Sequence, residues 1–190
     1  MDLILASKSA TRAKILKSFD IKFSQVGVDF DEDLLPYKKP KDFVYHATKG
    51  KLEAYLAKNE LDKPVLCADT VVCADDEILR KAKDKYRARE ILLKQSGNSV
   101  SILTCMFYKT KNMEFIDLSA TKYLFYEFDT KKLESYLSGD EWRDKAGACM
   151  VEGFCKEYIK EVIGYQSTAM GLSVEKLIPF LKLNDETIAQ

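Results

Sequence analysis

The sequence predicts a mixed α/β domain, and three observations carry this prediction. Apolar runs with the two-residue period of strands alternate with segments in which apolar residues recur every three or four positions, as in helices. Glycine, proline and short polar clusters separate the two kinds of segment. The chain has 190 residues and contains no repeat or linker, so we expect one domain spanning residues 1–190.

The first third of the chain is expected to alternate strand and helix. The apolar run Leu3–Ala6 predicts a buried strand, and Thr11–Phe19 predicts a helix with its apolar residues on one face. Lys22–Val28 alternates like a second strand. The stretch Asp29–Pro40 is acidic and contains proline, which predicts a loop, and Phe43–Ala57 has the apolar spacing of a second helix.

The middle of the chain holds the most strand-like segment, Val65–Ala74, which is almost continuously apolar. Asp84–Gln95 then has helical spacing, and a Ser-Gly-Asn sequence ends it. Ser99–Tyr108 and Phe115–Phe128 are expected to be paired strands, because the polar turn Lys109–Asn112 joins them.

The last third is expected to add two helices and a strand. Asp129 is suited to cap a helix that Gly139 ends, since an Asp side chain accepts free N-terminal amides and glycine tolerates helix-closing conformations. Phe154–Ile163 alternates like a strand. Ser173 is expected to open the last helix, which Pro179 should kink.

Composition excludes several classes of protein. Thirty Lys and Arg residues balance thirty Asp and Glu residues, whereas nucleic-acid-binding proteins usually carry a basic excess, so no nucleic-acid partner is expected. No apolar run reaches the length of a membrane span, so no membrane partner is expected either. The single histidine, His46, rules out a histidine-rich metal site and is expected on the surface of its helix.

The cysteines favour a cytoplasmic protein. The five cysteines form no CxxC pair, and the N-terminal residues lack the pattern of a signal peptide. We therefore expect all five to be reduced thiols. Cys67 and Cys73 are expected to pack as small apolar residues on a strand.

A hydroxyl-rich turn, Ser7–Arg12, lies between the first predicted strand and the first predicted helix. Such a turn presents backbone amides and the positive end of the helix dipole, which suits an anion. Arg12 could add a two-pronged phosphate contact. In the other interpretation Ser9 simply caps the helix, and the residues alone leave both open.

Asp69 and Thr70 interrupt the apolar run of the most strand-like segment. A carboxylate in a buried strand is costly unless it is paired or binds a metal, so its presence indicates a functional site. The alternative is a structural carboxylate that backbone amides satisfy. The pattern favours the site but does not exclude the alternative.

Further charged residues stand near the ends of predicted elements. The acidic group Asp29–Asp33, which includes Glu32, could hold Mg²⁺ or Mn²⁺ through its oxygens, although an acidic loop is more often simply solvated. Lys51, Lys81 and Lys145 are isolated lysines. Each of them taken alone is expected to face solvent.

In this order along the chain, these segments resemble the Maf family of nucleoside triphosphate pyrophosphatases. LILASKSATRAKIL is similar to the family's LILASxSPRRxxLL, PVLCADTVV to PVLGADTVV, and DKAGACMVEGF to DKAGAYGIQGF. VDFDED, EILRKAKD and GYQSTAMGLS resemble three further blocks of the family. The resemblance runs from Leu3 to about Leu183.

The resemblance implies an elongated, curved mixed sheet flanked by helices, with two lobes around a central cleft, similar to inosine triphosphatases. It also implies hydrolysis of a nucleoside triphosphate to the monophosphate and pyrophosphate with Mg²⁺ or Mn²⁺. By position, Asp69 matches the family's proton acceptor, and Glu32 matches the acidic residue near the metal, which Asp69 would help to hold. The matches to substrate-binding positions are Ser9, Arg12, Lys51, Thr70, Lys81, Lys145 and Glu152.

Departures from the family pattern leave the preferred base unassigned. Thr70 resembles the subgroup that acts on dTTP and UTP, Glu152 resembles the subgroup that acts on 7-methyl-GTP, and Thr11 stands where the family has an arginine. The alternative function is a non-catalytic nucleotide-binding regulator of cell division, which would use the same cleft. Relatives form homodimers, and the residues themselves give no sign for or against one.

Overall fold

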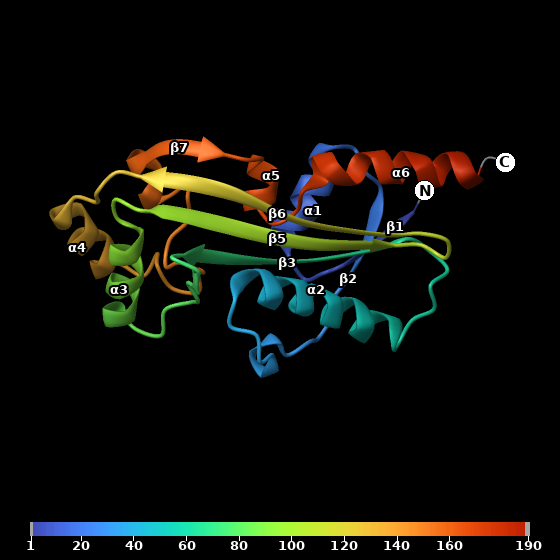
Figure 1. Ribbon diagram of the computed structural model, residues 1–190, viewed down its shortest axis with the longest axis horizontal. Helices are drawn as coiled ribbons and strands as arrows, with labels where there is room; N and C mark the ends of the chain where they lie inside the picture. The colour runs from blue at the N-terminus through green and yellow to red at the C-terminus, as the bar shows by residue number, and fades with distance from the viewer. Residues whose placement is uncertain (1, 189–190) are drawn as a thin grey trace.

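The computed structural model describes residues 2–188 and shows an elongated domain built on one mixed sheet (Figure 1). Within these residues the strand order is β2-β1-β3-β5-β6-β7, and β4 pairs with the end of β3. β1 runs parallel to β2 and β3, and every other pair is antiparallel. The strands are β1 Leu3–Ala6, β2 Phe23–Val26, β3 Val65–Ala74, β4 Glu77–Ile78, β5 Ser99–Lys109, β6 Glu114–Phe125 and β7 Ile159–Ile163.

Helices cover both faces of the sheet. In Figure 1, α2 lies below the strands, and α1 and α6 lie above them. The helices α3 and α4 lie at the left, where β5 begins and β6 ends. Short 3₁₀ turns occupy Glu32–Leu34 and Phe154–Tyr158. The helices are α1 Ala10–Ser18, α2 Pro40–Leu56, α3 Lys85–Gln95, α4 Thr130–Ser138, α5 Gln166–Ala169 and α6 Val174–Ile188.

Three apolar clusters hold the two lobes together. Two of them lie on opposite faces of the sheet at β1, and the third lies at the other end of the sheet. Successive side chains of a strand point to opposite faces, so Leu3 and Leu5 of β1 pack under α1 and α6, whereas Ile4 and Ala6 pack against α2. The third cluster surrounds the buried Trp142 and joins α3 and α4 to the other end of the sheet. The predicted elongated α/β architecture with two lobes is thereby confirmed.

One predicted strand is wrong over its first half. Within Phe154–Ile163 only Ile159–Ile163 is a strand, because Phe154–Tyr158 forms a 3₁₀ turn. Phe154, Cys155 and Tyr158 pack inward together, and a spacing of one and four residues brings side chains to one side of a helical turn rather than to one face of a strand. The long β6 also ends at Phe125, three residues before the predicted end.

The strand β4 has no counterpart in the sequence-based prediction. Asp75 and Asp76 between β3 and β4 both have positive φ angles, 49° and 59°, which are the conformations of a tight hairpin turn.

Pro179 lies inside α6, as predicted. Among the residues that the structure describes, no helix combines the length and the apolar character that crossing a membrane requires.

The prediction of five reduced cysteines is wrong for two of them. Cys149 and Cys155 form a disulfide, whereas Cys67, Cys73 and Cys105 are free and buried in the sheet. The turns between Cys149 and Cys155 fold the chain back on itself and bring the two sulfur atoms together. A separation of six residues is no recognised pairing signature, which is why the spacing did not reveal it.

The prediction of a surface position for His46 holds only in part, because the residue is partly exposed. Its ring is half-buried and stacks on the ring of Tyr37, with the centroids 3.8 Å apart and the planes nearly parallel. The ring of Tyr45 meets it edge-on. The histidine therefore packs the loop before α2 onto the helix.

Candidate active site

A cleft of about 520 Å³ opens beside the end of β1, where the chain turns into α1. β1 is followed by the hydroxyl-rich turn, β2 by the acidic loop, and α2 and the segment after β4 close the remaining sides. Cationic, acidic and hydroxyl groups thus share one concave surface. The lining residues are Ala6, Ser7, Lys8, Ser9, Arg12, Val28, Asp29, Phe30, Asp31, Glu32, Lys51 and Lys81.

Lys51 is the central group of this cleft. Its Nζ lies 2.7 Å from Asp69 Oδ1 and 2.9 Å from Glu32 Oε2, so one ammonium group joins two carboxylates. The three residues come from α2, β3 and the 3₁₀ turn after β2. α2 packs across β3 with its apolar side, which places Lys51 above the middle of that strand.

Asp69 lies on β3 and is only 7% exposed. Burial raises the pKa of this carboxyl above its ordinary value of 3.8, the positive charge of Lys51 opposes the rise, and the negative charge of Glu32 adds to it. Asp69 is not itself a lining residue and meets the cleft through its contact with Lys51. A buried carboxylate with a raised pKa beside a charged cleft is well suited to accept a proton. The structure therefore joins Lys51, Glu32 and Asp69, which the sequence placed in three separate motifs.

Arg12 is held by three oxygen atoms of the protein. Its Nε donates to the carbonyl of Gly171 at 2.8 Å, and its two Nη atoms donate to Ser7 Oγ and Thr70 Oγ1, each at 3.1 Å. Thr70 Oγ1 also shares a hydrogen bond with Thr104 Oγ1 at 3.0 Å. Arg12 thus joins the start of α1 to β3 and to the turn before α6.

We expect the Arg12→Lys variant to lose about 2 kcal/mol of unfolding free energy, because a lysine keeps the charge but cannot reach all three oxygen atoms at once. Urea denaturation measures this change. Lys14→Ala on the exposed side of the same helix serves as the control and should change stability by less than about 0.5 kcal/mol. An Arg12→Lys variant as stable as the wild type would contradict this role.

Gly50 precedes Lys51 on α2 and lies against the ring of Phe30. A Cβ atom at position 50 would come within 2.2 Å of Phe30 Cζ and 2.4 Å of Phe30 Cε2, which is closer than packed atoms allow. Phe30 lines the cleft between two acidic residues. The absence of a side chain at Gly50 therefore lets the acidic loop approach the helix.

We expect Gly50→Ala to lower kcat/KM by up to about 10²-fold, because the added methyl group displaces Phe30 and with it the acidic loop. Helix propensity alone would make this change favourable by about 1 kcal/mol, so the loss would come from the contact. Removing the ring in Gly50→Ala/Phe30→Ala should restore part of the activity. Gly50→Ala activity equal to the wild type would refute the contact's importance.

The other predicted residues differ in their relation to the cleft. Ser9 lines it and also caps α1 by accepting from the Arg12 backbone amide at 3.3 Å, so both interpretations of Ser9 hold. Lys81 is exposed at the cleft and its backbone forms an isolated bridge with Ala146. Lys145, whose Nζ donates to a backbone carbonyl, and the exposed Glu152 do not line the cleft.

Lys8 belongs to the cleft although sequence reasoning missed it. Its Nζ is paired with Asp29 across the opening. The signal was available, since Lys8 stands in the same hydroxyl-rich turn as Ser9 and Arg12. A basic residue in a turn that presents backbone amides favours an anion for the same reason as Arg12 does.

Fold and cleft together define a mixed α/β protein with a charged site at the ends of parallel strands. The solved structure of the Staphylococcus aureus Ham1 protein has the same fold, with a TM-score of 0.52 over 97% of this chain and 100% of that one, at 14% identity. Residues 2–183 match the family described as Maf-like protein, and the chain belongs to this family.

Relatives named "Nucleoside triphosphate pyrophosphatase" cover nearly the whole chain. The protein from a Nitratiruptor species is 57% identical over 94% of this chain and 97% of its own length. A Helicobacter pylori relative is 41% identical over 96% of each chain, and one from Campylobacter jejuni is 39% identical over 94% of this chain. The chain is accordingly an enzyme, a hydrolase acting on acid anhydrides.

Proposed function

We propose that this cleft hydrolyses a nucleoside triphosphate to the nucleoside monophosphate and pyrophosphate. The observation that carries the proposal is the position of Lys51, whose ammonium group lies between the buried Asp69 and Glu32 on one side of a cleft lined with cations and hydroxyls. The name that the relatives carry describes the same reaction.

Asp69 is proposed to accept the proton of the attacking water. Burial raises its pKa and makes it a stronger base than an exposed Asp, while the positive charge of Lys51 favours its ionised form. Lys51 would turn from bridging two carboxylates to contacting a phosphate oxygen as negative charge develops there. Stabilisation of that charge and orientation of the water are the main requirements of phosphoryl transfer.

The triphosphate is proposed to lie along the start of α1. The free amides and dipole of this nine-residue helix favour an anion, and Ser9, Lys8 and Lys81 add donors around the opening. Arg12 has five N–H donors, of which the three hydrogen bonds above use three, so two remain for a phosphate. Arg12 would therefore both hold the lining of the cleft together and bind the triphosphate.

Glu32 and Asp69 fit a divalent cation such as Mg²⁺ or Mn²⁺. Their oxygen atoms converge on the same Lys51 Nζ, and Mg²⁺ is usually bound by one or two carboxylates together with substrate phosphates. In residues 2–188 no group of three or more His, Cys, Asp or Glu is placed to hold a metal ion, so substrate phosphates would have to complete the coordination. When bound, the cation would neutralise phosphate charge and acidify water.

The base of the substrate is left open by the proposal. Thr70 is hydrogen-bonded to Arg12 and Thr104 and does not line the cleft, and Glu152 is exposed on the segment between Cys149 and Cys155. These positions, together with Lys145, remain predicted substrate-binding residues.

The test of the proposed function is to incubate the purified chain with Mg²⁺ or Mn²⁺ and a panel of standard and methylated nucleoside triphosphates, and to measure the pyrophosphate released. No release from any member would overturn the proposal.

A further inference from the structure

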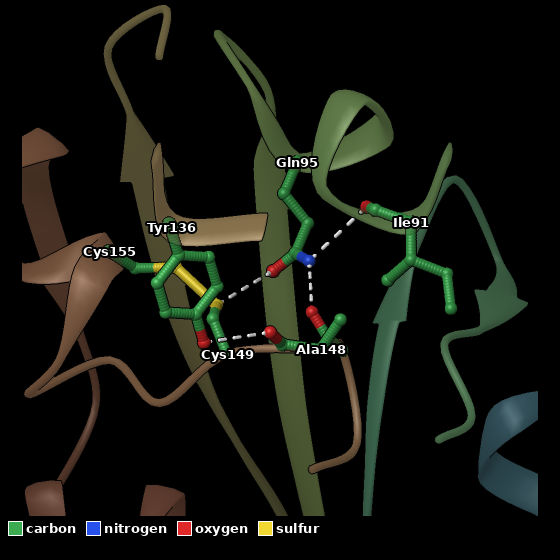
Figure 2. The surroundings of a disulfide bond; sticks show 7 residues. Ile91, Gln95, Tyr136, Ala148, Cys149 and Cys155 are labelled. Carbon is green, nitrogen blue, oxygen red and sulfur yellow. Dashed lines mark hydrogen bonds between the residues drawn. A yellow bond between two sulfur atoms is a disulfide. The ribbon is translucent and has the colours of Figure 1, made fainter. Parts of the chain in front are cut away.

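The disulfide Cys149–Cys155 lies beside the segment that holds one wall of the cleft. Figure 2 shows Gln95 of α3 facing this disulfide, with Tyr136 of α4 on the same side. The segment 145–149 follows α4 and precedes the 3₁₀ turn. Neither sulfur atom takes part in the chemistry proposed for the cleft, so the disulfide has a role separate from that reaction.

Several hydrogen bonds attach the segment to its surroundings. Gln95 Nε2 donates to the carbonyl of Gly147 at 2.6 Å, and Tyr136 Oη donates to the carbonyl of Ala148 at 3.1 Å (Figure 2). The Gly147 amide donates to the carbonyl of Leu79 at 3.0 Å. The bridge between Ala146 and Lys81 then connects the segment directly to a lysine of the cleft.

The two sulfur atoms differ in access. Cys149 is partly exposed, whereas Cys155 is completely buried in the cluster around Trp142. An external thiolate would therefore approach Cys149 rather than Cys155. The leaving group would be the buried Cys155 sulfur, which stays in place and can re-form the bond.

Gln95 offers Cys149 a second partner. The Cys149 Sγ lies 3.8 Å from Gln95 Oε1 (Figure 2), a distance at which a thiol can donate a hydrogen bond. A disulfide sulfur carries no proton, so this hydrogen bond exists only in the reduced state. Gln95 Nε2 also holds the carbonyl of Gly147. Reduction therefore exchanges the covalent bond from Cys149 to the buried Cys155 for a weak thiol hydrogen bond to Gln95, which holds the segment less firmly.

The remaining cysteines are protected from the same chemistry. Burial raises the pKa of Cys67 and Cys105 to about 12 and that of Cys73 to about 11, so almost no thiolate exists at neutral pH. All three lie within strands of the sheet. A thiol reagent would thus act selectively at the Cys149–Cys155 pair.

We propose that Cys149–Cys155 is a reversible redox-modification site whose co-reactant is a dithiol, and that its state controls how firmly the segment 145–149 holds the Lys81 wall of the cleft. The effect on substrate rests on the proposed function.

The exchange balances with this one co-reactant. One thiolate of the dithiol attacks Cys149 Sγ, the bond to Cys155 breaks, and Cys155 takes up a proton. The second thiol of the reductant then displaces Cys149 as a thiol and leaves as a disulfide. The reverse reaction with the oxidised dithiol restores the bond.

The test poises the purified chain in mixtures of reduced and oxidised dithiothreitol. Free thiols are counted by alkylation and mass spectrometry, and KM and kcat are measured for a hydrolysed nucleoside triphosphate. We expect two thiols to appear together, and KM to rise roughly fivefold or more with little change in kcat, because the loosened wall is less pre-organised. Re-oxidation should restore the original KM.

Variants separate this role from a merely stabilising disulfide. Cys149→Ser and Cys155→Ala should hold the raised KM in every mixture, whereas Cys73→Ala should respond like the wild type. Reduction should also lower the Tm by about 5 °C, but a purely structural disulfide would do the same. Thiols that appear without a change in KM, or a disulfide that does not react, would overturn the proposal. Absence of hydrolysis in both states would refute the proposed function instead, and the thiol count would still report the exchange.

Discussion

We expect the Asp69→Asn variant to release pyrophosphate about 10²- to 10⁴-fold more slowly than the wild type, because an amide cannot accept the proton of the attacking water. The fold should survive. Burial disfavours the ionised form of Asp69 and raises its pKa, so a neutral side chain of the same shape removes a cost rather than a support. Single-turnover kinetics and thermal unfolding of the same preparation measure the two effects.

Asp117 provides a matched control. It is also a buried carboxylate on a strand, only 9% exposed, and its Oδ1 is bonded to Lys176 Nζ at 3.0 Å. Its partner Lys176 does not line the cleft, whereas the partner of Asp69 is the cleft residue Lys51. Asp117→Asn should therefore keep the wild-type rate. A rate for Asp69→Asn within about threefold of the wild type would show that Asp69 is not the base.

The second large effect is expected for Lys51→Met. Loss of the ammonium group should lower kcat/KM by about 10²- to 10³-fold, which is typical of removing one preorganised group that stabilises transition-state charge. Methionine keeps the length and the apolar stem of the side chain. Lys49→Met on the same helix, where Lys49 is exposed and only loosely paired with Glu53 at 3.6 Å, should leave kcat/KM unchanged.

The same variant should have a stability that depends on pH. Lys51 lowers the pKa of Asp69, so without Lys51 that pKa rises further above its unfolded value. A carboxyl whose pKa is higher in the folded than in the unfolded state lowers the free energy of unfolding at pH values at which it is ionised. This loss of stability disappears as the pH falls below the pKa of the unfolded state. In buffer without divalent cations, we expect a deficit of about 2 kcal/mol at neutral pH that shrinks towards pH 4.

A double variant separates stability from catalysis. Lys51→Met/Asp69→Asn has no unpaired buried charge at this position, so it should regain most of the lost unfolding free energy while staying inactive. Urea denaturation at neutral pH measures the recovery. A double variant as unstable as Lys51→Met would show that the lysine stabilises the fold through packing rather than through the carboxylates.

The fold class could be predicted from the sequence because the apolar periods of its strands and of its helices are both clear. β1 and β3 are buried on both faces, and such strands appear as continuous apolar runs. Asp69 stood out for the same reason, as a charge within an apolar run. The exception at Phe154–Tyr158 came from aromatic residues whose packing is decided by the cluster around Trp142, not by local alternation.

Contacts between distant segments could not be predicted in this way. The sequence shows Lys51, Glu32 and Asp69 in different elements, and only the packing of α2 on β3 brings their charges together. The fit of Phe30 over Gly50 likewise depends on a loop meeting a helix. The pairing of Cys149 with Cys155 depends on how the turns between them fold.

The product stoichiometry of a single reaction tests the central claim most directly. The purified wild-type chain is incubated with Mg²⁺ and the best substrate of the panel, and nucleoside monophosphate, pyrophosphate and orthophosphate are quantified together. The account predicts equal amounts of monophosphate and pyrophosphate without orthophosphate, and almost none of either product with Asp69→Asn. Orthophosphate with nucleoside diphosphate, or undiminished pyrophosphate from Asp69→Asn, would contradict it.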